Sequence, residues 1–325
     1  MNNISRRGLA ATVASLVITS SVAACGGGSS ASDSSGASGA PISIGIGVDG
    51  TFAAFVVADA QGMFKKAGVN VNVVQFAAGG DAVQAIAGKQ VQMAGASPTT
   101  ALTVMGQNEK LQVLLSYMKS ETYLKVVANP KVKTAADIKS IGVVPGVSTY
   151  LAHKYFESEG IDASKVKFVS SSPAELPSLT KKGDLDAFLL WEPWPTTGEG
   201  MGLHALTDTG KFGQPTTQVL VGESDWISSH GPEIAKVAKG LTEASDFIKK
   251  DPEAAAEIVS KAMKMDKKVA LAEIKQVDYN VRGLNDSDMT SFKEQSAYFV
   301  KAGTMKTAPD LSKHLLMSWY ADNVK

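Results

Sequence analysis

Three segments of this sequence place small polar residues where a predicted strand ends and a predicted helix begins. They are Gly50-Thr51, Ser97-Pro98-Thr99-Thr100 and Gly146-Val147-Ser148-Thr149. At a helix start several backbone N–H groups have no partner inside the helix, and the helix dipole adds partial positive charge. With a hydroxyl nearby, such a start can bind a carboxylate, sulfonate, phosphate or nitrate without an arginine. Ser and Thr also cap helices that bind nothing, so only the three segments together favour an anion site.

Aromatic residues gather near the same junctions. They are Phe52, Tyr117, Tyr123, Tyr150, Trp191 and Trp194. Such rings can clamp the organic part of a ligand, and Tyr hydroxyls can orient it. The alternative is that Phe52 and Tyr150 only fix helices to their sheets, which is the favoured interpretation for Phe52. Trp194 lies between two prolines after an apolar strand, where a core role is harder to explain.

Glu192 is the charged residue of most interest. It follows the apolar segment 185–190 and precedes Pro193. Its carboxylate could pair with an amine of the ligand, cap a helix, or bridge two parts of the fold. The sequence leaves these three roles open.

Two series of alternating strands and helices carry the junctions. The first has predicted strands at 42–48, 69–76, 91–96 and 111–117, with helices at 52–67, 81–87 and 99–107. The second has predicted strands at 124–128, 141–144, 166–169 and 185–190, with helices at 150–159 and 173–182. A further strand at 217–221 returns toward the first series, and helices fill the chain from 232 onward. Such series build mostly parallel sheets with helices packed on them.

The sequence therefore predicts an α/β fold of two similar lobes joined by a hinge. One lobe comprises 42–120 and 225–325, and the other comprises 121–224. The links between them are expected near 117–124 and 217–227. Each lobe is expected to hold a mixed, mostly parallel sheet flanked by helices.

Charge and composition exclude several classes of function. Lys and Arg together number 32, as do Asp and Glu, and no basic block is present, so nucleic acid is not an expected partner. The four histidines are His153, His204, His230 and His314, and they show no paired ligand spacing. We therefore expect no metal site and no cofactor. Arg282 is the only arginine beyond residue 7, so an anion would be held by Arg282, a lysine or backbone amides.

The N-terminus predicts export. Arg6-Arg7 precede a short apolar run that ends in Val22-Ala23-Ala24-Cys25, the only cysteine. Residues 1–24 are typical of a secretory signal peptide, and the triplet before Cys25 resembles a bacterial lipobox, in which the cysteine carries the lipid. The run is too short for a membrane-spanning helix. Residues 25–41 are rich in Gly, Ser and Ala, as expected for a flexible linker. The sequence leaves open whether export uses the Sec pathway or the twin-arginine pathway.

The whole chain resembles the substrate-binding lipoproteins of ABC importers in the nitrate/sulfonate/taurine-binding family. The resemblance depends on the lipobox, on 62–68 (GMFKKAG), 79–81 (GGD), 91–97 (VQMAGAS), 141–149 (IGVVPGVST), 183–187 (GDLDA) and 191–194 (WEPW). It implies a periplasmic-binding-protein type 2 fold that closes on its ligand by a hinge. The closed form would deliver the ligand to a membrane permease driven by an ATPase.

Carried over by position, the resemblance places ligand-binding residues at the junctions. With Tyr117 and Trp194 added, they are Thr51, Phe52, Ser97, Thr99, Tyr117, Ser148, Thr149, Glu192 and Trp194. It implies a monomer on the outer face of the cell membrane that binds a small organic anion, either a sulfonate, taurine or a carboxylate. A thiamine pyrimidine precursor or nitrate is the alternative ligand. A thiamine-pyrimidine-synthase-like enzyme is disfavoured, because the export signal does not suit a cytoplasmic enzyme and no activated nucleophile is apparent. No catalytic residue is predicted.

Overall fold

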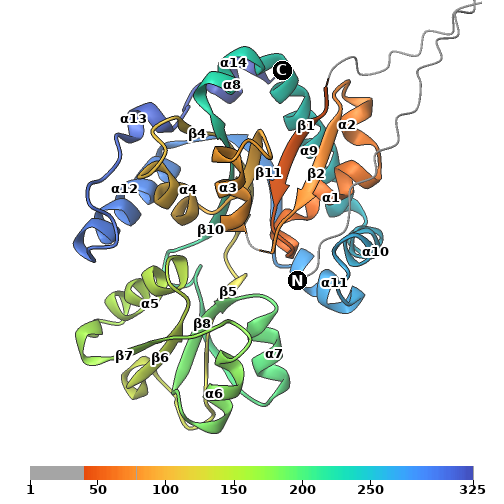
Figure 1. Cartoon of the computed structure of the whole chain (residues 1–325). Coiled ribbons are helices and arrows are strands. Elements are labelled where there is room, and N and C mark those ends of the chain that lie inside the picture. Colours follow the sequence, from red (N-terminus) through yellow and green to blue (C-terminus); the bar gives the residue numbers. More distant parts are fainter. Residues whose placement is uncertain (1–39, 78, 325) are drawn as a thin grey trace, which may run out of the picture. The chain divides into compact units, whose positions relative to one another are not determined.

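The computed structural model describes residues 40–77 and 79–324. The predicted signal peptide, Cys25 and nearly all of the linker lie outside these residues. Two β-sheets, each flanked by helices, organise the described chain (Figure 1). In this part of the chain no helix is long and apolar enough to span a bilayer.

The first sheet has six strands in the order β11-β4-β10-β3-β1-β2. Their bounds are β1 Ile42–Ile46, β2 Val71–Gln75, β3 Met93–Ala96, β4 Leu111–Ser120, β10 Thr216–Glu223 and β11 Asp278–Gly283. β1 pairs parallel with β2 and β3, whereas β10 runs antiparallel between β3 and β4, and β11 is antiparallel to β4. The carboxyl ends of β1 and β3 therefore meet at one edge, where the first two polar junctions follow.

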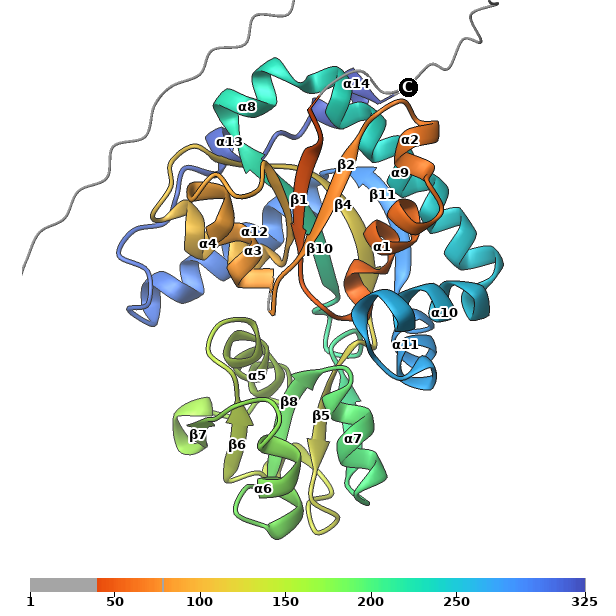
Figure 2. The same ribbon diagram turned by 45° about the vertical axis from the view of Figure 1, so that its right-hand side comes forward.

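Helices cover both faces of the first sheet (Figure 2). One face packs against α1, α9 and α10, whose buried residues form a single apolar cluster with β1 and β4. The other face packs against α3, α4 and α12. The helices of this lobe are α1 Ala53–Ala60, α2 Met63–Lys66, α3 Gly79–Ala87, α4 Pro98–Met105, α8 Ser224–Ser229, α9 Gly231–Lys250, α10 Pro252–Met263, α11 Lys267–Ile274, α12 Asp286–Lys301, α13 Leu311–His314 and α14 Trp319–Asn323, with the 3₁₀ turn η1 Gly50–Phe52.

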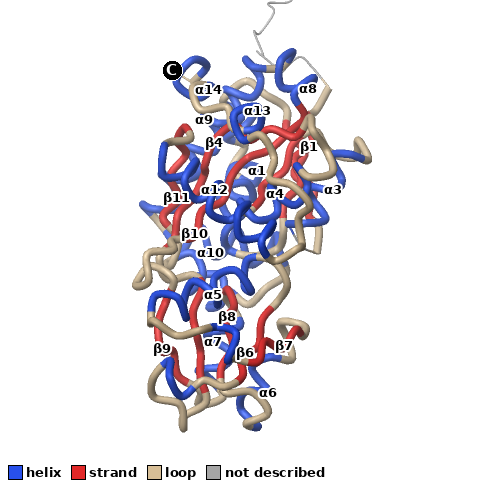
Figure 3. The backbone as a smooth tube through the Cα atoms, turned by 90° about the vertical axis from the view of Figure 1, so that its left-hand side faces the viewer, coloured by secondary structure: helices blue, strands red, loops and turns tan. Residues whose placement is uncertain are grey.

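The second sheet has five strands in the order β7-β6-β8-β5-β9 (Figure 3). They are β5 Leu124–Ala128, β6 Ser140–Val143, β7 Lys167–Ser170, β8 Ala187–Trp191 and β9 His204–Asp208, with helices α5 Val147–Ser158, α6 Leu176–Lys182 and α7 Trp194–Gly200 and the 3₁₀ turns η2 Ala135–Asp137 and η3 Ala163–Lys165. Successive strand residues point to opposite faces. Leu189 accordingly packs in the cluster that includes α5, and its neighbours Phe188 and Leu190 pack with Leu176 of α6.

The lobes are linked twice. β4 leads to β5 through residues 121–123, and β9 leads to β10 through residues 209–215. β10 is a central strand of the first sheet and so lies in the first lobe, whereas the second lobe was predicted to extend to residue 224. The second link accordingly precedes the predicted 217–227.

Three features of the sheets differ from the sequence-based expectations. Parallel pairs do not predominate, because each sheet also contains antiparallel pairs made by the strands that enter and leave the links. β9 was not predicted, and β11 lies in the segment predicted to be wholly helical. β11 carries only two buried apolar residues, Tyr279 and Val281, so its alternating pattern is short, and its partner β4 lies far away in sequence.

Candidate functional site

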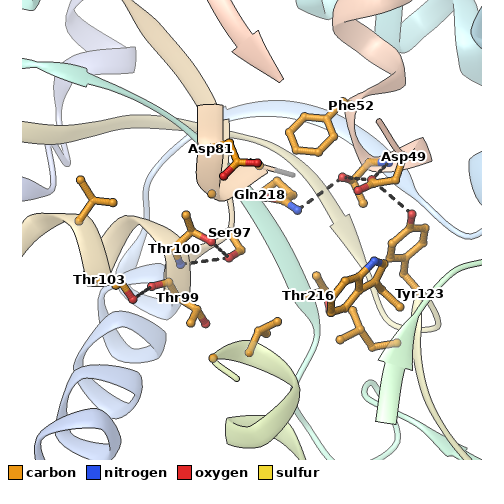
Figure 4. A pocket seen from close by; sticks show the side chains of 18 of the residues that line it. Asp49, Phe52, Asp81, Ser97, Thr99, Thr100, Thr103, Tyr123, Thr216 and Gln218 are labelled. Atoms are coloured by element: carbon orange, nitrogen blue, oxygen red, sulfur yellow. Dashed lines mark hydrogen bonds between the residues drawn. The ribbon is translucent and has the colours of Figure 1, made fainter. Parts of the chain in front are cut away.

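A pocket of about 510 Å³ is lined by residues of both lobes (Figure 4). The first lobe contributes the loop after β1, the starts of α3 and α4, and Thr216 and Gln218 of β10. The second lobe contributes Tyr123 of the first link, Leu124 of β5, the loop before α5, and Trp191 at the end of β8. The pocket therefore combines residues from all three polar junctions that the sequence singled out.

The start of α4 is held in place by its own side chains. Ser97 is the N-cap, and its Oγ accepts a hydrogen bond from the Thr100 N–H at 3.1 Å. Pro98 has no N–H, and the first intrahelical bond runs from Ala101 N to the Ser97 carbonyl. Helix geometry thus leaves the Thr99 N–H free for a ligand. The Thr99 hydroxyl donates to Gln295 Oε1 of α12 at 2.6 Å, so Thr99 lines the pocket but its hydroxyl is already used.

The start of α5 presents backbone to the pocket. Pro145, Gly146 and Val147 line it, whereas the predicted Ser148 and Thr149 do not. Ser148 is fully buried; its Oγ accepts from the Val144 N–H at 3.1 Å and donates to the Leu189 carbonyl at 2.6 Å.

The Thr149 hydroxyl donates to the Val144 carbonyl at 3.1 Å. The two side chains that were predicted to face the cleft therefore tie the start of α5 to β8 and to the preceding loop. The N–H groups before Tyr150, the first intrahelical donor in α5, are left for a ligand.

Asp49, which was not among the predicted site residues, lies directly before the Gly50-Thr51 junction and caps η1. Its Oδ1 accepts hydrogen bonds from Thr51 N at 2.9 Å, Thr51 Oγ1 at 2.5 Å and the Tyr123 hydroxyl at 3.3 Å. Burial raises the pKa of Asp49, and the hydrogen bonds from Thr51 and Tyr123 oppose this shift. Thr51 lines the pocket, and its hydroxyl donates a hydrogen bond to Asp49.

Tyr123 also connects Asp49 to a second buried carboxyl group. Its hydroxyl lies 3.3 Å from Glu273 Oε2, which accepts a hydrogen bond from the Gly50 N–H at 2.5 Å. Glu273 Oε1 is buried without a hydrogen-bond partner in the described chain. Burial, together with the charge of Asp49, raises the pKa of Glu273 to about 7.

This shift predicts a pH-dependent stability. A carboxyl group whose pKa is higher in the folded protein stabilises the fold fully below its unfolded pKa and loses that contribution as pH rises through the folded pKa. For Glu273 the loss falls between pH 4.5 and about pH 7. Glu273→Gln is therefore expected to raise the free energy of unfolding by about 2–3 kcal/mol at pH 8 and to change it little near pH 4.

Denaturant unfolding of both proteins from pH 4 to pH 8 checks this expectation. Glu109→Gln, at an exposed position, is the matched control and should follow the unsubstituted protein. If the free energies of unfolding of Glu273→Gln and the unsubstituted protein differed by the same amount across this pH range, the expected protonation of Glu273 would be contradicted.

Glu192 bridges the lobes. It is buried, and its carboxylate accepts hydrogen bonds from Lys125 Nζ at 2.7 Å, Gln276 Nε2 at 3.0 Å and Thr196 N at 3.1 Å. Burial acts to raise the pKa of Glu192, but these hydrogen bonds and the charge of Lys125 outweigh it, and the pKa is lowered. Glu192 does not line the pocket. Its carboxylate connects the lobes through Gln276 and caps the start of α7 through the Thr196 N–H.

Some of the predicted aromatic residues line the pocket and others do not. Phe52 lines the pocket, and so do Tyr123 and Trp191. Tyr117 does not line it; the ring is buried edge-on against Phe55 with centroids 4.9 Å apart, and its hydroxyl has no partner in the described chain. Trp194 begins α7 and packs against the cluster around Phe188, away from the pocket lining.

Comparison with known proteins identifies the family. The sequence profile of the NMT1/THI5-like family matches residues 49–255, more than half of the chain. The chain therefore belongs to this family. The taurine-binding periplasmic protein of Escherichia coli (strain K12) is 28% identical over 197 residues, which span 58% of this chain and 61% of that protein.

Solved structures confirm the predicted two-lobed α/β fold. The periplasmic aliphatic sulphonate binding protein SsuA of Escherichia coli superposes with a TM-score of 0.74 at 15% identity, covering 84% of this chain and 91% of that one. The alkanesulfonate-binding protein SsuA of Xanthomonas axonopodis pv. citri, bound to MOPS, superposes with a TM-score of 0.71 at 16% identity, covering 86% and 99%.

Proposed function

We propose that this protein is the extracytoplasmic solute-binding receptor of an ABC importer and that it captures a small organic acid. The observation that carries the proposal is the pocket itself, in which the starts of α4 and α5, from different lobes, present backbone N–H groups to one cavity. The relatives named above are a taurine-binding protein and two sulfonate-binding proteins, and the latter two have the same fold.

Binding would proceed by closure of the two lobes. A ligand that contacts Thr99 of one lobe and Val147 of the other gains both sets of contacts only when the lobes are together. Its differential affinity for that form sets how far the population shifts. The two links, residues 121–123 and 209–215, are the hinge in this account.

The pocket favours an acid with an organic part over a bare inorganic ion. Phe52, Tyr123 and Trp191 supply aromatic surface, which an alkyl or aryl group can cover and nitrate cannot. The acid group would be placed at the helix starts, where no cationic side chain is needed.

The membrane partners and the anchor complete the proposal. A closed receptor would dock on a permease that is driven by a cytoplasmic ATPase. Cleavage before Cys25 and its lipidation would hold the protein, as a monomer, on the outer face of the membrane. We infer a binding role and no catalysis, so the ligand would be released unchanged.

A thermal-shift panel of sulfonates, amino sulfonates, carboxylates, nitrate and pyrimidines tests this function. A cognate acid at about 100 times its Kd should raise Tm by roughly 5–10 °C. Recovery of the ligand unchanged after incubation separates a receptor from an enzyme. If no small acid in the panel shifted Tm, the proposal would be lost.

A further inference from the structure

The charges that line the pocket do not match those expected of a site for a simple anion. Its lining includes two carboxylates, Asp49 and Asp81, and no Lys, Arg or His. An anion placed there gains the backbone donors of the helix starts but is repelled by both carboxylates. In a cavity partly shielded from water this repulsion is stronger than in bulk solvent.

Asp49 is oriented so that one of its oxygens is available. Oδ1 accepts all three hydrogen bonds described above, from Thr51 and Tyr123. Oδ2 accepts none within the described residues. The capping of η1 by Asp49 accounts for the hydrogen bonds that Oδ1 accepts. It gives Oδ2 no structural role.

Asp81 adds a carboxylate from a different element. It lies in the first turn of α3, and its side chain is exposed. Its structural role there would be a favourable interaction with the helix dipole, which any position in the first turn would provide. That role does not require it to line the same pocket as Asp49.

The pocket also holds unsatisfied polar groups. Thr216 Oγ1 and Gln218 Oε1 are buried without hydrogen-bond partners in the described chain, and both residues line the pocket. Buried polar atoms normally have partners, so these two indicate that a ligand group is missing from the site. Gln218 Oε1 can only accept, and the Thr216 hydroxyl can accept or donate, so a ligand that carries N–H groups would satisfy both.

Figure 4 shows how the two kinds of group are distributed. Asp49 lies with Phe52 and Tyr123 on one side of the pocket, and Ser97, Thr99 and Thr100 lie on the other. Asp81 lies above Ser97 in this view, on the side of the α4 start. Helix-start donors and both carboxylates are therefore presented to the same cavity.

We propose that the pocket selects zwitterions, with the acid group of the ligand on the starts of α4 and α5 and its protonated amine on Asp49 and Asp81. This deepens the proposed function and rests on it. The aromatic rings of Phe52, Tyr123 and Trp191 favour the same ligand class, because an ammonium group is attracted to aromatic faces. Acids without an amine would leave both carboxylates unpaired.

Two probes that differ in one group test the proposal. Titration calorimetry compares 2-aminoethanesulfonate with 2-hydroxyethanesulfonate, which carries a hydroxyl in place of the amine. The unsubstituted protein should bind the amine at least tenfold more tightly. Asp81→Asn and Asp49→Asn should each reduce this preference, and Asp81→Asn, at an exposed position, should do so without loss of folding. Asp286→Asn, an exposed first-turn aspartate of α12, is the matched control and should keep the full preference.

The outcomes separate this inference from the proposed function. Equal binding of the two probes, or a preference that survives both substitutions, would overturn the role of Asp49 and Asp81 and leave the receptor intact. Tight binding of amine-free acids alone would do the same. Failure of every acid in the thermal-shift panel would remove the proposed function and this inference with it.

Discussion

Replacing Gly146 by alanine is expected to weaken binding of the acid ligand by at least tenfold. Gly146 precedes α5 with φ 99° and ψ −123°, a conformation that residues with a Cβ rarely adopt. Alanine would cost about 1–3 kcal/mol there or force the loop into another conformation. Either change displaces the N–H groups at the start of α5 that are proposed to hold the acid.

Gly160 provides the matched control at the other end of the same helix. It also has a positive φ, of 68°, and no atom lies near the position of an added Cβ. Gly160→Ala should lower stability by about 1 kcal/mol and leave ligand affinity unchanged. Calorimetric titration and denaturant unfolding of both variants give the two quantities. If Gly146→Ala bound the ligand as tightly as Gly160→Ala, the start of α5 would not be the acid site.

Truncating Glu192 to alanine is expected to destabilise the protein by about 3 kcal/mol or more. The side chain of Glu192 is 1% exposed and that of its partner Lys125 is 17% exposed. Removing one member of a buried ion pair leaves the other charge desolvated and uncompensated, which is more costly than losing a surface pair. The hydrogen bond to Gln276, which joins the second lobe to the first, is lost as well.

Glu121→Ala is the comparison for this prediction, because Glu121 pairs with Lys119 where both side chains are about half exposed or more. Its loss should cost less than about 1 kcal/mol. Free energies of unfolding from denaturant titration at pH 7 measure both. Similar values for the two variants would show that the Glu192 bridge contributes no more than a surface ion pair.

Local sequence patterns predicted most of the elements. The apolar spacing of α1, the Ser97-Pro98 start of α4 and the Gly183 end of α6 are all set by neighbouring residues. β11 and the true position of the second link depend on pairing with β4, which lies far away in sequence. Short polar strands of this kind cannot be recognised from their own residues.

The sequence predicted which backbone segments line the candidate site better than it predicted which side chains do. The junctions that line the pocket follow from strand–helix order, and Thr51, Phe52, Ser97 and Thr99 line it. Ser148 and Glu192 were expected there because they are polar and follow strands, but their partners, the Leu189 carbonyl and Lys125, come from tertiary contacts. Asp49 was missed for the same reason, since its contact with Tyr123 spans 74 positions.

Amide hydrogen exchange, measured with and without the acid that stabilises the protein most, tests the central claim directly. The account predicts that ligand slows exchange at Thr99 in one lobe and at Val147, Ser148 and Thr149 in the other, with added protection in the links at 121–123 and 209–215. Protection confined to one lobe, or absent from both helix starts, would contradict a ligand held between the lobes by backbone amides.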